Sequence, residues 1–130
     1  MLDVDIAQLE DTVTEIKGLL RDGLIATDVW DIATGLSLAG HNPQPEATAL
    51  FNLLTQEMQR TLRGSGFPGL DRYYILDLEQ SNIVVCQLHG EDMMSGMLLD
   101  ANRTNLGVLV SVAIPRYASG VSKARRGGDN

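Results

Sequence analysis

The stretch DRYYILDLEQSNIVVCQLHGEDMMSGMLLD, from Asp71 to Asp100, constrains the fold more than any other part of the chain. It holds three runs of strand-forming residues, which the short polar turns EQSN and HGED separate. Turns this short join antiparallel neighbours, because parallel strands need a long crossover connection. The sequence therefore predicts a meander of three antiparallel strands.

The rest of the chain supplies two more strands and three helices. Apolar residues recur at helical spacing from Asp3 to Leu20, and strand patterns at 24–30 and 36–42 flank a turn that contains Gly35. A second helix begins at the prolines of HNPQPE and ends at Gly64, and a third follows the meander. The order α-β-β-α-β-β-β-α predicts an α+β fold, a five-stranded antiparallel sheet with helices on both faces.

The second helix has an unusual outer side. One side forms an apolar stripe, and the opposite side carries Asn52, Gln56 and Arg60 together with the apolar residues Ala49 and Leu53. A helix that faces only water needs a more polar outer side than this. We therefore expect this side of the helix to contact another protein. The stripe that we expect to face the sheet consists of Ala47, Leu50, Phe51, Leu54, Met58 and Leu62.

Length and charge limit the function classes. The 130 residues suit one domain, which we expect at 1–120, followed by a flexible basic tail at 121–130. Pro115 should kink or split the last helix. The net charge of −7 argues against nucleic acid as the main ligand. The sequence shows no signal peptide and no apolar run long enough to span a membrane, and its single cysteine fits a reducing cytosol, so we expect a cytoplasmic protein without integral membrane association.

The two carboxylates in DVWDIATG are candidates for a catalytic pair. Asp28 and Asp31 are three residues apart, so on a strand they point to opposite faces, which is poor geometry for a shared site. We therefore expect Asp31 to serve the turn and Asp28 to lie on a solvated face.

The remaining reactive residues predict no catalytic, cofactor or metal site. Cys86 lies among apolar residues in mid-strand, where a thiol is usually inert, and His41 and His89 with one cysteine lack metal-ligand spacing. Trp30 is interpreted as a core residue first and a binding anchor second. The methionines of MMSGM are interpreted as core filler, with an adaptable interaction surface as the alternative.

Three motifs in this order resemble the roadblock family, which is named for a dynein light chain. They are the hairpin VWDIATGLSLAG, the helix ATALFNLLTQEMQRTL and the segment LLDANRTNLGVLV, which looks like the last strand, an Asn/Asp-rich turn and the start of the final helix. The resemblance covers roughly residues 9–117. It implies a roadblock/profilin-like sheet with the middle helix on one face and the terminal helices on the other.

The resemblance also implies a homodimer and a partner. Roadblock dimers join through their middle helices and through strands that pair across the axis, and family members scaffold or regulate small Ras-like GTPases. The resemblance therefore predicts a non-enzymatic scaffold or regulator of a small Ras-like GTPase, which can be a GTPase-activating partner. If the chain supplied an arginine finger, Arg60, Arg63 or Arg72 would be candidates, but we expect none. The alternative is a structural or sensory adaptor that binds another protein through its dimer surface. The predicted interface residues are Ala49, Leu53, Gln56, Arg60, Arg72, Tyr73 and Tyr74, within the helix and the strand 72–76.

Overall fold

A computed structural model describes residues 2–126 of the chain and shows the predicted α+β order. The helices and strands are α1 (Ile6–Leu20), β1 (Leu24–Asp31), β2 (Ser37–His41), α2 (Pro45–Gly64), β3 (Tyr73–Leu78), β4 (Asn82–His89), β5 (Met93–Asp100), α3 (Leu106–Val108) and α4 (Ile114–Ala124). Short 3₁₀ turns at Arg21–Gly23 and Ala101–Arg103 and a π-helical segment at Leu109–Ala113 complete the order.

The five strands form one antiparallel sheet in the order β2-β1-β5-β4-β3, as predicted. The first hairpin joins the meander at the meander's last strand, because β1 pairs with β5. This closure places β1 and β5 in the interior of the sheet and leaves β2 and β3 as its edges. Successive residues of each strand then point alternately to the two faces of the sheet.

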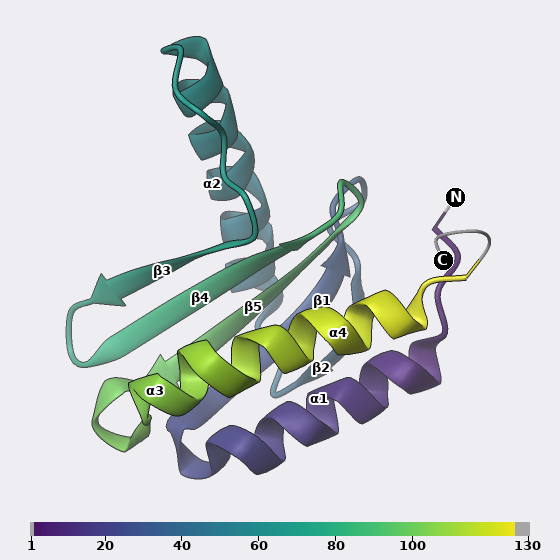
Figure 1. The fold of residues 1–130 in the computed structure, drawn as a ribbon, viewed down its shortest axis with the longest axis vertical. Helices are drawn as coiled ribbons and strands as arrows, with labels where there is room; N and C mark the ends of the chain where they lie inside the picture. The colour runs from purple at the N-terminus through teal and green to yellow at the C-terminus, as the bar shows by residue number, and fades with distance from the viewer. Residues whose placement is uncertain (1, 127–130) are drawn as a thin grey trace.

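One face of the sheet is covered by α1 and α4, which lie side by side (Figure 1). Asp5 caps α1 by accepting a hydrogen bond from the Gln8 backbone N–H at 3.3 Å. The two helices approach closely at Gly120, where a Cβ atom would lie 2.2 Å from the Thr12 hydroxyl oxygen. Large apolar side chains from both helices and from the sheet are fully buried in this layer; among them are Leu9, Ile16, Val29, Val85, Met93, Leu99, Leu109, Tyr117 and Val121.

The other face carries α2 alone, and its core is smaller. Trp30, Val84, Cys86 and Met94 are the buried members of this cluster. Figure 1 shows that α2 leaves the sheet at a steep angle, so that its C-terminal end stands clear of the strands. The predicted placement, with the middle helix on one face and the terminal helices on the other, is confirmed. Because Met93, Met94 and Met97 are at most 2% exposed, the core interpretation of the methionines is right and the surface alternative is wrong.

Pro115 changes the type of the last helix but does not end it. The π-helical segment runs to Ala113, and the Ile114 N–H bonds to the Leu109 carbonyl five residues back. Pro115 then occupies the first turn of α4, where the missing N–H of a proline is tolerated. The predicted kink or split is therefore a switch from π-helical to α-helical hydrogen bonding.

The last helix also passes the predicted domain boundary at residue 120. Val121 and Ala124 are completely buried, and the Asp5 N–H bonds to the Ala124 carbonyl at 2.8 Å. Residues 121–126 of the predicted flexible tail are therefore the end of α4 and its attachment to the N-terminal segment, while residues 127–130 lie outside the described residues. None of the helices within residues 2–126 combines the length and the apolar character that a membrane crossing requires.

Candidate protein-binding surface

The outer side of α2 forms a stripe of four exposed residues, Ala49, Leu53, Gln56 and Arg60. Their spacing places them on one line along the helix. Leu53 is 61% exposed, and Leu50 beside it is 56% exposed. Arg60 forms a surface ion pair with Glu57 at 2.6 Å, which contributes little to stability because both side chains are largely solvated. We call Ala49, Leu53, Gln56 and Arg60 the outer stripe.

The inner side of α2 is held to the rest of the fold by hydrogen bonds. Thr48 donates to Asp28 at 3.1 Å, and the hydroxyls of Thr55 and Tyr74 share a bond of 2.8 Å. Asn52 accepts from the Trp30 indole N–H at 3.0 Å and donates to the Ile32 carbonyl at 3.1 Å. One turn after Thr55, the Gln59 side chain accepts from the Leu70 backbone N–H at 2.8 Å. We call Thr48, Asn52, Thr55 and Gln59 the polar ladder.

The polar ladder corrects the sequence-based assignment of the helix faces. Leu50, which we expected to face the sheet, is exposed, and Asn52, which we expected on the outer side, contacts Trp30. Thr48 and Thr55 are the buried residues of α2. The inner face of this helix therefore combines the hydrogen-bonded polar ladder with half-buried apolar residues of the expected stripe, such as Phe51, and Leu50 is the one member of that stripe that lies outside.

Strand β3 places the other predicted interface residues at the free edge of the sheet. The Arg72 side chain is 80% exposed, and its guanidinium carbon lies 5.9 Å from the centroid of the Tyr73 ring. Tyr73 and Tyr74 are half-buried on opposite faces, Tyr73 against the cluster under α1 and α4 and Tyr74 against α2. Burial, together with the neighbouring Cys86 thiol, raises the pKa of Tyr74, so this hydroxyl stays protonated and serves the bond to Thr55. The Arg72 side chain, the exposed residues Ile75 and Leu78 and the free edge of the strand are the parts of this region that a partner can reach.

The two carboxylates of the first hairpin lie apart, as the spacing predicts. Asp31 accepts from the Ala33 N–H at 3.1 Å and from the Thr34 hydroxyl, which stabilises the turn. Asp28 is only 6% exposed, so the expectation of a solvated face is wrong for this residue. Its two oxygens accept from Ser37 at 2.5 Å and from Thr48 at 3.1 Å, and burial raises its pKa despite these bonds. Its hydroxyl donors lie nine and twenty residues further along the chain, on β2 and α2, so the strand pattern of β1 alone does not signal its burial.

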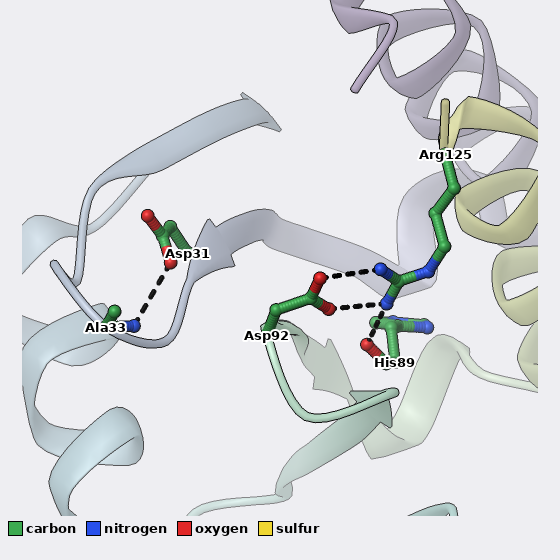
Figure 2. A network of polar contacts seen from close by, with 5 residues as sticks. All are labelled: Asp31, Ala33, His89, Asp92 and Arg125. Atoms are coloured by element: carbon green, nitrogen blue, oxygen red, sulfur yellow. Dashed lines mark hydrogen bonds and ion pairs between the residues drawn. The ribbon is translucent and has the colours of Figure 1, made fainter. Parts of the chain in front are cut away.

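A second polar network joins the turn between β4 and β5 to the end of α4. Figure 2 shows the Arg125 guanidinium bonded to both carboxylate oxygens of Asp92, at 2.7 and 2.5 Å, and to the His89 carbonyl. The hydrogen bond from Arg125 lowers the pKa of Asp92. Gly90 makes this approach possible, because a Cβ atom there would lie 2.7 Å from the guanidinium. The Ile32 N–H bonds to the Asp92 carbonyl at 2.9 Å, so the first hairpin joins the same network.

Cys86 and the two histidines do not form a nucleophilic site in the described residues. Cys86 is 1% exposed, and burial raises the pKa of its thiol to about 11. His89 is buried on the face covered by α1 and α4, bonds through Nε2 to the Ser95 hydroxyl at 2.7 Å, and has its pKa lowered to about 4, chiefly by burial. Between residues 2 and 126, no group of three His, Cys, Asp or Glu side chains is arranged to hold a metal ion.

The comparisons with known proteins identify the fold. No model of a protein family and no curated sequence matches the chain. The structure of MglB from Myxococcus xanthus matches with a TM-score of 0.78 and 13% sequence identity, over 95% of this chain and 91% of that one. The gliding protein MglB from Thermus thermophilus matches with a TM-score of 0.70 and 16% identity, over 95% and 97%. The Roadblock/LC7 domain from Streptomyces avermitilis matches with a TM-score of 0.60 and 16% identity, over 88% and 92%.

This chain has the roadblock fold. The fold that the sequence resemblance implied is therefore confirmed, including its likeness to profilin, since a profilin from Schizosaccharomyces pombe matches with a TM-score of 0.53. The three motifs that carried the resemblance form the β1–β2 hairpin, α2, and the end of β5 with α3. Sequence reasoning missed the polar ladder and the Arg125 network of this roadblock fold. The i, i+4, i+7, i+11 spacing of Thr48, Asn52, Thr55 and Gln59 is the one signal that could have revealed the ladder.

Proposed function

We propose that this chain is a non-enzymatic, cytoplasmic, homodimeric regulator or scaffold of a small Ras-like GTPase. The observation that carries the proposal is the outer stripe of α2 together with the free edge of β3. Five large apolar side chains between residues 50 and 78 are exposed: Leu50, Leu53, Phe67, Ile75 and Leu78. Exposed apolar side chains that are concentrated in one stretch of the sequence, next to an unpaired strand edge, are typical of protein contact surfaces.

The dimer uses both parts of this surface. Two copies of β3 pair across a twofold axis and extend the sheet, because an edge strand offers unpaired backbone N–H and C=O groups. The outer stripes of the two α2 helices meet over the joined strands, and Leu53 lies at the centre of the contact. One of the MglB structures with this fold is described as having a tetrameric arrangement, which supports self-association as a property of such chains.

The partner class follows from the fold and the resemblance together. Roadblock proteins scaffold or regulate small Ras-like GTPases, and MglB and MglC of Myxococcus xanthus share this fold. The mechanism is binding, because the described residues place no nucleophile or metal cluster on the surface that we propose. Any stimulation of GTP hydrolysis then comes from ordering the GTPase's own groups, since phosphoryl transfer depends mainly on positioning and electrostatics.

The test is GTP turnover by a small Ras-like GTPase encoded beside this chain, measured with and without the protein. We expect binding that prefers one nucleotide state, and a change in turnover if the protein regulates the GTPase. The variant Leu53→Arg, which places a charge in the dimer contact, is the control for dimer dependence. Absence of both binding and a rate change would contradict the proposal, and binding that ignores the nucleotide would favour the adaptor alternative.

A further inference from the structure

The sheet is hollowed on its α2 face around Asp28. Asp28 pairs with Gly40 on β2 and with Gly96 on β5, so a glycine stands on each side of it in the same cross-strand row. A Cβ atom at Gly40 would lie 2.8 Å from an Asp28 carboxylate oxygen, and one at Gly96 would lie 3.2 Å from the Trp30 ring. The two glycines therefore make the room that Asp28 and Trp30 occupy on this face.

A cavity of about 80 Å³ adjoins this row beneath the first turns of α2. Its walls are mostly apolar: Trp30, Val84 and Leu98 from the sheet, and Ala47 and Phe51 from the helix. Asp28 and Thr48 are its main polar side chains toward β1. At roughly 15 Å³ for each water-sized group, this volume has room for on the order of five heavy atoms.

Asp28 is the one ionisable side chain in the walls of this cavity, and it has no cationic partner within residues 2–126. Its bonds from Ser37 and Thr48 are bonds from neutral hydroxyls. An ionised carboxylate offers about four acceptor sites, and Asp28 also accepts from the Val29 backbone N–H, so these three donors leave capacity for one more. A buried carboxylate that lacks a counter-charge is costly, and a cation within hydrogen-bonding distance would lower that cost.

We propose that this cavity binds a primary alkylammonium group of about four carbons, with its ammonium on Asp28 and its alkyl chain against Trp30 and Phe51. The chemistry matches both halves of the site, because the chain removes apolar surface from water and the ammonium supplies the missing charge. A free alkylamine and a lysine side chain of a bound protein both carry this group. The site lies on the inner side of α2 and is independent of the dimer contact on the outer stripe.

The experiment follows Trp30 fluorescence while n-butylammonium chloride is added to the full-length protein. Trp30 is the single tryptophan and lines the cavity, so its emission reports occupancy directly. We expect a saturable change with n-butylammonium and at least a tenfold weaker response to 1-butanol, which has a similar shape but no charge. An equal response to both compounds would overturn the proposal, because it would show that the carboxylate has no part in binding.

Two variants separate the site from general effects on the fold. Asp28→Asn keeps the size of the side chain and removes its charge, and we expect it to weaken n-butylammonium binding at least tenfold. Ala47→Leu fills the cavity from the helix and should abolish the response even if Asp28→Asn does not fold. Unchanged binding by either folded variant would overturn the proposal. Nα-acetyl-lysine N-methylamide then distinguishes the sources: its binding assigns the site to a lysine side chain, and binding of n-butylammonium alone assigns it to a free amine.

Discussion

The two faces of the sheet are built in different ways. The face under α1 and α4 buries one continuous apolar cluster, in which helix and sheet residues such as Ile16, Val85 and Tyr117 are fully enclosed. The face under α2 has the small cluster around Trp30, and its helix is attached by the polar ladder together with half-buried apolar residues such as Phe51. Burial of apolar area stabilises the first face. On the second face, directional hydrogen bonds fix the position of α2 against the sheet.

This difference explains how α2 can leave two leucines outside. A helix that is held partly by hydrogen bonds needs less apolar packing on its inner side, so Leu50 and Leu53 can remain exposed. Net stabilisation by one hydrogen bond is only about 1 kcal/mol, whereas a buried leucine contributes about 2 kcal/mol. The α2 helix therefore retains exposed apolar surface, and the proposed dimer would bury it.

The largest expected effect is on the face under α1 and α4. Ile16→Ala should lower the free energy of unfolding by about 2–5 kcal/mol, because Ile16 is completely buried between α1 and the sheet. Leu36→Ala, at a turn residue that is 66% exposed, should change it by less than about 0.5 kcal/mol. Chemical denaturation of both variants measures the difference. Similar losses for the two would show that this face is not the stabilising core.

The second effect concerns pH, because the same face buries His89. Its pKa is lowered to about 4 in the folded protein, so between about pH 6.5 and pH 4 the unfolded chain binds a proton that the folded chain does not. This group's contribution is complete above pH 6.5 and is lost as the pH falls, at roughly 1.4 kcal/mol per pH unit and about 3 kcal/mol in total. Denaturation of wild type and His89→Gln across this range isolates the effect. Parallel pH profiles would contradict it.

Asp28 on the α2 face should act in the opposite direction. Its folded-state pKa is raised, so its contribution is complete below pH 3.8 and is lost as the pH rises through the folded-state value. Asp28→Asn should therefore gain stability relative to wild type as the pH rises toward neutrality. The same denaturation series measures this change, and a relative loss with rising pH would show that Asp28 has a cationic partner.

A smaller effect tests the polar ladder. Asn52→Leu removes the partner of the buried Trp30 N–H and of the Ile32 carbonyl, and should cost about 1–3 kcal/mol although it adds apolar area. Gln56→Leu on the outer stripe of the same helix is the matched control and should change the stability of the monomer by less than about 0.5 kcal/mol. If Asn52→Leu stabilised the protein, α2 would be held by apolar packing after all.

The two faces also differ in how well the sequence predicts them. Helical spacing and turn residues predicted the strands, the sheet type and the helix α1, because these signals are local. The orientation of α2 was not predictable in this way, since its inner residues Thr48 and Asn52 are polar and their partners lie twenty or more residues away. Arg125 was assigned to a tail for the same reason, because its partner Asp92 is 33 residues distant.

The most direct test of the central claim is the mass of the protein in solution by light scattering. We predict a wild-type mass of about twice 14.1 kDa, a shift to 14.1 kDa in Leu53→Arg, and no shift in Leu36→Arg, an exposed residue of the β1–β2 turn that is not part of the outer stripe. A wild-type mass of 14.1 kDa, or a Leu53→Arg protein that stays dimeric, would contradict the assignment of the α2 face as the surface that a second copy covers.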